Sequence, residues 1–214
     1  MADELVDVFD ENYAIQGQCM KSVAHKYGLW VHSFHCWIIN LEGEGSVYVQ
    51  RRAPHKKLFP DTLDITAAGH LQAGETIEEG IREIKEELNL DVKYSDLIYT
   101  GIKHDAAKLN DIVNRQFSHV FLYQTKTPVT SIIPDGDEVY GLIEIPLKSG
   151  LDLFSKKISS VNCQGIEYNT KTSSWDTCNF DVTLNHFIPR VDNYYYKIFI
   201  MADLLKSGYQ HLSI

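Results

Sequence analysis

One stretch of the sequence constrains the local fold more than any other: GHLQAGETIEEGIREIKEELNL, residues 69–90. Its apolar residues recur at spacings of four, three and four, at Ile77, Ile81, Ile84 and Leu88. That spacing places them on one face of a helix and predicts a helix over 76–88. Asn89 follows the last apolar residue, where a left-handed cap often uses Gly or Asn.

The same helix carries a dense group of acidic side chains. Glu83, Glu86 and Glu87 are three and four residues apart, so they fall on one side of the helix, next to the apolar stripe. Like charges placed this way weaken a helix, and a solvated acidic face is one interpretation. The other is a hard divalent cation such as Mg²⁺, which reverses the sign of that effect. Arg82 lies beside the group and could hold one carboxylate by a bidentate hydrogen bond.

The rest of the chain alternates between strand and helix patterns. Runs rich in aromatic and β-branched residues predict strands at 4–9, 32–40, 46–52, 62–68, 97–103, 117–124 and 141–147. A turn-rich link is expected at 10–18, and helices at 149–155 and 193–206. Residues 156–190 are rich in Ser, Thr, Asn and Asp, so we expect loops there, with short strands at GIEY and FDVTL. Strands on both sides of one strong helix predict an α+β sandwich.

Composition narrows the class of partner. The formal net charge is −9, which argues against broad nucleic-acid binding and against adhesion to anionic membranes. No run of about 18 apolar residues is present, and the acidic start MADELVDVFDEN lacks the layout of a secretory signal. Four cysteines without a CxxC pair indicate reduced thiols in a cytoplasmic protein, although Cys163 and Cys178 could pair.

The order of residues in the acidic stretch resembles the Nudix box, G-x5-E-x7-R-E-U-x-E-E-x-G-U with U aliphatic. The positions that match it are Gly69, Glu75, Arg82, Glu83, Ile84, Glu86, Glu87 and Leu90. Two departures exist: Asn89 replaces the later Gly, and six residues rather than seven separate Glu75 from Arg82. A one-residue deletion inside a helix rotates its two parts by about 100° relative to each other. The unit Arg82 to Glu87 is intact, and Glu75 reaches the site only if the preceding loop absorbs the deletion.

The resemblance implies a fold and a reaction. It implies an α/β/α sandwich with a mixed β-sheet, here one domain over 1–214 with a core at about 30–155, an N-terminal strand extension at 1–29 and a C-terminal extension with the closing helix at 156–214. It also implies hydrolysis of a diphosphate linkage with Mg²⁺ or Mn²⁺ as the cofactor. Glu83, Glu86 and Glu87 would ligate the metal, and Glu86, Glu87, Arg82 and Glu138 would form the catalytic group. Glu138 in PDGDEV could equally be a solvated loop charge.

Segments beyond the box resemble the subgroup related to isopentenyl-diphosphate isomerase: LVDVFDENYAIQG, AHKYGLWVHSFHCWIIN and VYVQRRAPHKKLFPDTLDITAAGHLQAGE. Members of that subgroup shift a double bond with a cysteine and a glutamate, and hold a metal among histidines and glutamates. His25, His32 and His70 match, as metal ligands or as structural residues. Ala67 and Ala68 stand where the cysteine is expected. Asn114 and Gln116 stand where glutamates are expected, and neutral amides cannot act as acid–base groups.

These observations favour a pyrophosphohydrolase that acts on a nucleoside diphosphate derivative or another small organic diphosphate. An isomerase and a Nudix-fold protein that binds its ligand without cleaving it are the alternatives. We expect Arg51, Arg52, Gly69, His70 and Glu75 to contact the substrate, although the basic segment 50–57 could also be a solvated loop. The three tyrosines at 194–196 cannot all face one side of a helix, so one should be exposed, line a pocket or cover a homodimer interface.

Overall fold

The computed structural model describes residues 3–109 and 112–214, which form one mixed sheet covered by helices on both faces. The strands are β1 Leu5–Phe9, β2 Ile15–Met20, β3 Trp30–Asn40, β4 Ser46–Arg52, β5 Leu63–Asp64, β6 Ala67–His70, β7 Leu97–Leu109, β8 Ile112–Gln124, β9 Val139–Pro146, β10 Val161–Asn169 and β11 Ser174–Val182. The α-helices are α1 Lys21–Tyr27, α2 Arg82–Leu88, α3 Leu147–Phe154 and α4 Tyr194–Lys206. Short 3₁₀ turns occupy Glu79–Ile81, Tyr94–Asp96, Val129–Ser131 and Leu184–His186.

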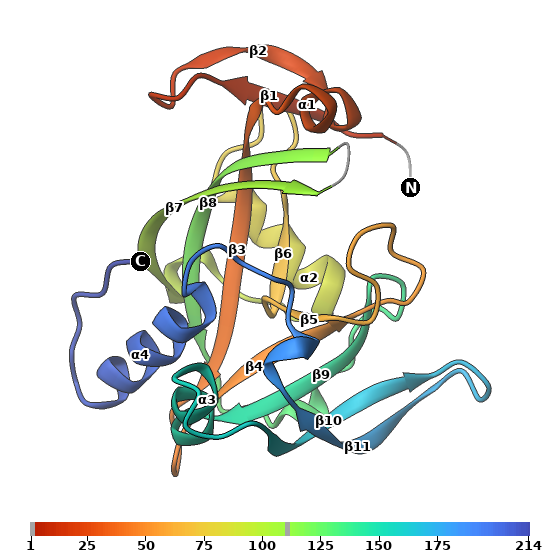
Figure 1. The fold of residues 1–214 in the computed structure, drawn as a ribbon, viewed down its shortest axis with the longest axis vertical. Coiled ribbons are helices and arrows are strands. Elements are labelled where there is room, and N and C mark those ends of the chain that lie inside the picture. Colours follow the sequence, from red (N-terminus) through yellow and green to blue (C-terminus); the bar gives the residue numbers. More distant parts are fainter. Residues whose placement is uncertain (1–2, 110–111) are drawn as a thin grey trace.

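The long strand β3 is the centre of the sheet (Figure 1). It runs parallel to β8 from the pair Trp30–Arg115 to the pair Ile39–Gln124, and antiparallel to β6 on its other side. The main order of strands is β11-β10-β9-β4-β3-β1-β2, with β7 paired to β8. The parallel pair within an otherwise antiparallel sheet confirms the mixed sheet that the resemblance implied.

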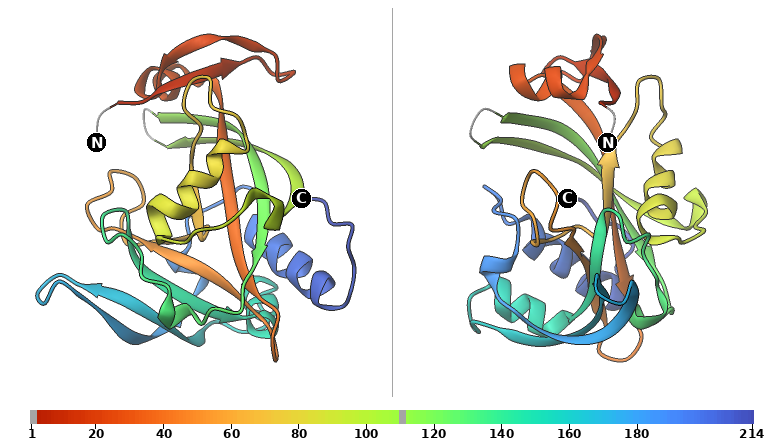
Figure 2. Two further views of the ribbon diagram at one scale, coloured as in Figure 1. Left: turned by 180° about the vertical axis from the view of Figure 1, so that it is seen from behind. Right: turned by 90° about the vertical axis from the view of Figure 1, so that its right-hand side faces the viewer.

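Helices cover the two faces of the sheet (Figure 2), and an apolar core lies on each face. Alternate residues of β3 point to each: Phe34 and Ile38 pack under α2, whereas Trp37 and Ile39 pack under α3 and α4. Burial on both faces explains why β3 reads as a nearly continuous apolar run. The arrangement confirms the expected α/β/α sandwich.

Four local predictions need correction. The link at 10–18 contains most of β2, which pairs with β1, and the expected strand 62–68 is split into β5 and β6, which join different partners. The helix expected over 76–88 begins as a 3₁₀ turn at Glu79 and is α-helical only from Arg82. The expected loop region 156–190 contains the nine-residue strands β10 and β11, which are longer than the short strands expected at GIEY and FDVTL. Their polar side chains face outward while Cys163, Ile166 and Val182 are buried, so tertiary packing overrides weak strand propensity.

The helices and cysteines add two simpler findings. No helix in the described ranges is long and apolar enough to cross a membrane. All four cysteines are free thiols, and Cys163 faces Phe180 across the β10–β11 hairpin while Cys178 faces Gly165. The alternative disulfide between Cys163 and Cys178 is therefore absent.

Candidate active site

Helix α2 is held against the sheet by its apolar face. Ile84 and Leu88 are fully buried in the core that contains Phe34 and Phe121. Each such side chain stabilises the fold by roughly 1.5–3 kcal/mol. The helix ends at Asn89, whose left-handed backbone (φ 55°, ψ 28°) directs its N–H to the carbonyl of Lys85, as the sequence predicts. The anchored helix fixes which acidic side chains face the sheet.

Glu87 is a buried carboxylate without a cationic partner. Its side chain points to the sheet, where Oε2 accepts the N–H of Ala68 at 3.0 Å and Nε2 of Gln50 at 3.4 Å. Neither donor is charged, and none of the ion pairs formed by the described residues includes Glu87. Burial, with a further contribution from Glu83, raises the pKa of this carboxyl well above its usual range. Buried carboxylates are normally paired or bound to metal, so the side chain of Glu87 suits a metal ligand.

Glu83 lies one turn earlier and is also nearly buried. Its carboxylate rests directly on the backbone of Gly69 in β6, because a Cβ at that position would lie only 2.1 Å from Cδ of Glu83. A larger residue at 69 would therefore displace the Glu83 carboxylate. Burial raises the pKa of Glu83 to about 7, although the neighbouring Arg82 opposes the shift.

Arg82 connects the acidic residues. Its Nε and Nη2 bind the two oxygens of Glu75 at 2.6 and 3.0 Å, and Nη2 also donates to the carbonyl of His70. Its Nη1 lies 2.8 Å from one oxygen of Glu83 and 2.8 Å from one oxygen of Glu86. Glu86 is the exposed member of the group. Glu75 therefore reaches Arg82 despite the deletion, as a fork-to-carboxylate pair of the strong bidentate kind.

The 3₁₀ turn at Glu79–Ile81 explains how the shorter segment spans the distance. Three residues of 3₁₀-helix rise about 6 Å and complete about one turn, whereas four residues of α-helix rise about 6 Å and complete about 1.1 turns. Winding three residues more tightly thus replaces four. A capping box stabilises the start, since Thr76 N–H donates to Oε2 of Glu79 at 2.8 Å and Glu79 N–H donates to Oγ1 of Thr76 at 3.3 Å.

Glu138 lies beside this group. Its carboxylate contributes to the raised pKa values of both Glu83 and Glu87, and it pairs with Lys56 at 2.5 Å. The loop before β9 is joined to α2 because Asp135 N–H donates to the carbonyl of Glu87 at 3.2 Å. The fold therefore brings Glu138 close to Glu83 and Glu87.

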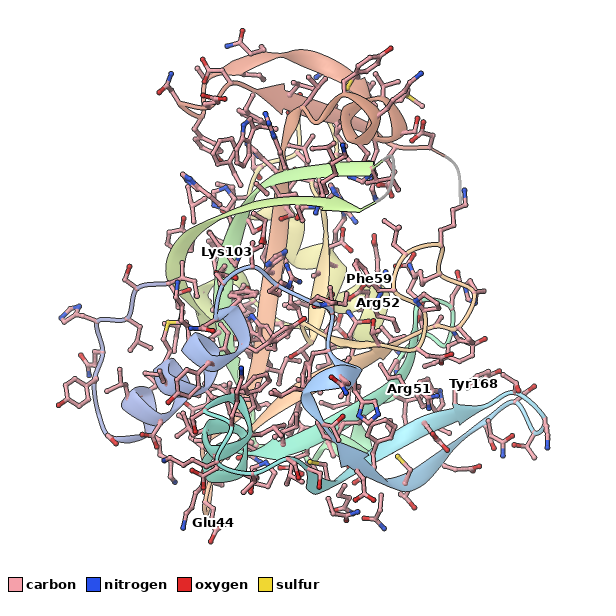
Figure 3. The ribbon with its side chains drawn as sticks, in the orientation of Figure 1. Glu44, Arg51, Arg52, Phe59, Lys103 and Tyr168 are labelled. Carbon is pink, nitrogen blue, oxygen red and sulfur yellow. The ribbon has the colours of Figure 1, made fainter. Side chains whose placement is uncertain are left out.

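The two arginines of the basic segment have different surroundings (Figure 3). Arg51 pairs with Glu167 at 3.0 Å and Asp61 at 3.3 Å, and both carboxylates are about half exposed. Arg52 donates to the carbonyls of Leu58 and Phe59, each at 3.2 Å, so it holds the loop that follows β4.

The histidines are divided between two places. His70 lies on β6 with its ring centroid 5.3 Å from that of His25, and its Nε2 contacts the amide nitrogen of Gln116 at 2.9 Å. Gln116 also donates to Oδ1 of Asn114 at 2.9 Å, so the two amides lie beside His70. His32 is elsewhere, stacked 3.8 Å from the ring of Phe9. The three histidines therefore do not converge on one point.

The donors suit a divalent cation that keeps much of its water. Among residues 3–109 and 112–214, no three His, Cys, Asp or Glu side chains form a ready-made metal cage, and Arg82 stands between Glu83 and Glu86. Mg²⁺ needs less, since it is commonly bound by one or two carboxylates together with waters and substrate phosphates. The unpaired carboxylate of Glu87 and the nearby Glu83 provide that minimum.

Several contributors could not be found from the sequence. Gln50 carries no motif, and only the register of β4 shows that it faces Glu87. A buried ionic cluster on the other face joins Arg190 to Asp64 at 3.0 Å and to Asp105 at 3.3 Å, and Asp105 also pairs with Lys103. The cluster fastens the C-terminal extension to the sheet. Its members lie up to 126 residues apart, so no local pattern indicates them.

A layered sandwich with an Arg-Glu-x-x-Glu-Glu helix on one face is the architecture expected of a Nudix protein, and comparisons agree. The NUDIX domain family model matches residues 31–153. An uncharacterised Nudix hydrolase of Clostridium acetobutylicum is 32% identical over 94% of this chain and 98% of that protein. The chain therefore belongs to the Nudix family, and it is a hydrolase of that family.

Two further proteins are similar to this chain over most of its length. An isopentenyl-diphosphate Delta-isomerase of Klebsiella pneumoniae is 30% identical over 65% of this chain and 74% of its own length. The crystal structure of DR0079 from Deinococcus radiodurans superposes with a TM-score of 0.54 and 24% identity, covering 72% of this chain and 90% of that one. The second comparison shows that the fold is shared.

Proposed function

We propose that the protein is a Mg²⁺- or Mn²⁺-dependent pyrophosphohydrolase that cleaves the diphosphate linkage of a nucleoside diphosphate derivative or another small organic diphosphate. The observation that carries the proposal is the buried carboxylate of Glu87, which lies beside Glu83 and has only neutral hydrogen-bond donors. A bound cation would compensate both carboxylates and present its open positions to a diphosphate.

The residues divide into three roles. Glu83, Glu86 and Glu87 would hold the cation, which when bound neutralises the diphosphate and lowers the pKa of an attacking water. Arg82 orients Glu83 and Glu86 through the contacts described above. Glu86 is exposed and Glu138 is partly exposed, so either carboxylate can accept the proton released by that water. Glu138→Gln and Glu86→Gln would separate the two by their pH–rate profiles.

Substrate contacts are proposed from accessibility. The ion pairs of Arg51 with the half-exposed Asp61 and Glu167 contribute only about 0–1 kcal/mol. Arg51 can therefore leave these partners at little cost and bind a phosphate of the substrate instead. Arg52 would act by ordering the loop at 58–59. Gly69 and Glu75 would shape the site through Glu83 and Arg82, and His70 would contact the substrate from β6.

The isomerase alternative is disfavoured by the residues that line β6 and β8. Ala67 and Ala68 have no titratable group that could transfer a proton, and the amides of Asn114 and Gln116 are hydrogen-bonded to each other. We therefore expect no allylic product when the protein is incubated with isopentenyl diphosphate and followed by proton NMR. The binding-protein alternative was motivated by the shortened box, and the intact pair between Arg82 and Glu75 argues against it.

The test is a phosphate-release screen with Mg²⁺ and Mn²⁺ over nucleotide sugars, dinucleotides, nucleoside triphosphates and isoprenoid diphosphates. Each compound is offered to the natural protein and to Glu87→Gln, which keeps the shape of the side chain but removes its charge. We expect cleavage of at least one compound by the natural protein alone. A protein that binds Mn²⁺ yet leaves the whole panel intact would support the binding-protein alternative.

We also propose that the enzyme works in the cytoplasm without a nucleic-acid or membrane partner, which the net charge of −9 supports. A homodimer remains a proposal as well. Tyr194 and Tyr195 are buried within the chain, so Tyr196 is the only one of the three tyrosines left to face outward. Light scattering coupled to size-exclusion chromatography measures the oligomeric state.

A further inference from the structure

The N-terminal strand reaches the loop that leads into the acidic helix. β1 belongs to a hairpin at one end of the molecule, and the loop after β6 rises toward it (Figure 2). Two hydrogen bonds join them: Ala73 N–H donates to the carbonyl of Leu5 at 2.9 Å, and Gly74 N–H donates to Oδ2 of Asp7 at 2.8 Å. β1 lies outside the residues matched by the NUDIX domain, so this contact is an addition to the domain.

The loop at this contact is a tight turn. Glu75 N–H donates to the carbonyl of Gln72 at 2.9 Å, and Gly74 has φ 80°, which a type II turn requires at its third residue. Ala73 and Gly74 are the two central residues, and their N–H groups would point to solvent without β1. Asp7 and the carbonyl of Leu5 thus satisfy both central donors of the turn.

The turn in turn fixes Glu75. Oε2 of Glu75 accepts the N–H of Gln72 at 2.7 Å, while both of its oxygens bind Arg82. Arg82 then contacts Glu83 and Glu86. Hydrogen bonds and the backbone of the turn therefore connect Asp7 to Glu83 and Glu86, which are proposed metal ligands.

We propose that Asp7 is a positioning residue for the metal-binding glutamates, acting through the Gly74 amide and the pair between Glu75 and Arg82. Because the segment between Glu75 and Arg82 is one residue short, it can adopt fewer conformations that bring the two side chains together. Its hydrogen bonds to the N-terminal strand hold the turn in one position. The inference rests on the proposed function in its last step, the use of the glutamates as metal ligands, whereas the link from Asp7 to the turn stands on geometry alone.

Pairing of β1 with β2 does not depend on the Asp7 carboxylate. The backbone ladder joins the two strands from Leu5–Met20 to Phe9–Ile15, and Asp7 adds only a side-chain bond from Gln18 at 2.9 Å. Asp7→Ala should therefore leave the hairpin formed and free the Gly74 amide. Asp7→Asn keeps an oxygen that can accept that amide, so it is the conservative rescue.

The experiment compares Asp7→Ala, Asp7→Asn and Asp10→Ala with the natural protein. Asp10 is the matched control, because its carboxylate accepts the N–H groups of Asn12 and Ala14 in the turn of the same hairpin. It has no hydrogen bond to the loop 71–75. Hydrogen–deuterium exchange reports the amides of Ala73 and Gly74, and isothermal titration with Mn²⁺ reports the metal site without turnover. For Asp7→Ala we expect the exchange rate of these amides and the Kd for Mn²⁺ each to rise about tenfold. Both values should stay close to those of the natural protein in Asp7→Asn and Asp10→Ala.

The two stages of the inference can fail separately. Unchanged exchange at Gly74 in Asp7→Ala would overturn the positioning role outright. Faster exchange with an unchanged Mn²⁺ Kd would confine Asp7 to the fold of the loop and overturn its role at the metal. If Asp7→Asn changed the exchange rate and the Mn²⁺ Kd as much as Asp7→Ala, the charge of Asp7 and not its hydrogen bond would position the loop. That result would also contradict the proposal. A protein that hydrolyses no diphosphate but gives the expected exchange and Mn²⁺ results would refute the proposed function and leave the positioning role intact.

Discussion

The close contact between Gly69 and Glu83 leads to a prediction that separates folding from catalysis. In Gly69→Ala the new Cβ would lie 2.1 Å from Cδ and Oε1 of Glu83, whereas ordinary contacts begin at 3.4 Å. The Glu83 carboxylate must therefore move by about 3.4 − 2.1 = 1.3 Å. The φ of Gly69 lies outside the left-handed region, so the backbone itself accepts alanine.

The displaced group is the end of a flexible side chain, and this decides the magnitudes. Rotation of Glu83 away from β6 costs the fold little, so we expect the free energy of unfolding to change by less than about 1 kcal/mol. A misplacement of about 1 Å at a reacting centre can lower the rate by about 100-fold, and we expect a loss of that order in kcat/KM. Mn²⁺ affinity should fall as well, because Glu83 is a proposed ligand.

The assay combines urea unfolding, Mn²⁺ titration and turnover of whichever compound the phosphate-release screen identifies. Ala68→Gly is the matched control, since it changes the neighbouring position of the same strand by the same methyl group without crowding Glu83. Natural Mn²⁺ affinity and turnover in Gly69→Ala would refute the reasoning. Global unfolding of Gly69→Ala would also refute it, because the contact would then serve the fold.

Three further predictions follow from the same structure. Glu86→Gln and Glu87→Gln should each lower turnover by orders of magnitude while circular dichroism stays unchanged, and full activity of either with Mg²⁺ would remove it from the metal site. Burial lowers the pKa of His119 from 6.5 to about 4, so the unfolded chain binds more protons between these values. The contribution of His119 to stability should be present above about pH 6.5 and fall by about 2 kcal/mol at pH 5. Because His32 titrates in the same range, His119→Gln should reduce this slope in urea titrations without removing it. Arg190→Met leaves two buried carboxylates without their arginine and should lower the free energy of unfolding by about 3–5 kcal/mol. Arg51→Met, whose partners are half exposed, should lower it by less than about 1 kcal/mol. Equal losses of the two variants in urea unfolding would contradict this reasoning.

Features encoded by local periodicity were predictable from the sequence. The spacing of Ile84 and Leu88 identifies the buried face of α2, and Asn89 ends the helix as expected. The arrangement of the acidic residues identified the Nudix fold, which the family match confirms. Local patterns succeed here because a helix brings together residues only three or four positions apart.

Features that depend on distant pairing were not predictable. The parallel pairing of β3 with β8 joins residues about 85 positions apart, Trp30 with Arg115, and nothing local encodes such a pair. The sequence predicts only short strands at GIEY and FDVTL within the β10–β11 hairpin, and the full strands form where β10 pairs with β9 and buries Cys163 and Ile166.

The site shows the same division. The acidic helix is local and was found, but whether Glu75 reaches Arg82 depends on a 3₁₀ turn that a count of residues does not reveal. Gln50 and Asp7 contact the site from other strands, so only the three-dimensional arrangement identifies them. Whether His25, His32 and His70 are metal ligands or structural residues also depends on tertiary structure, and His32 lies against Phe9.

Anomalous diffraction from crystals grown with Mn²⁺ tests the assignment of the metal site most directly. We expect a Mn²⁺ peak between the carboxylates of Glu83 and Glu87, with Glu86 nearby, and its loss in crystals of Glu87→Gln. A peak held instead by His25 and His70, or one that persists at full occupancy in Glu87→Gln, would contradict the proposal that the glutamate helix binds the catalytic metal.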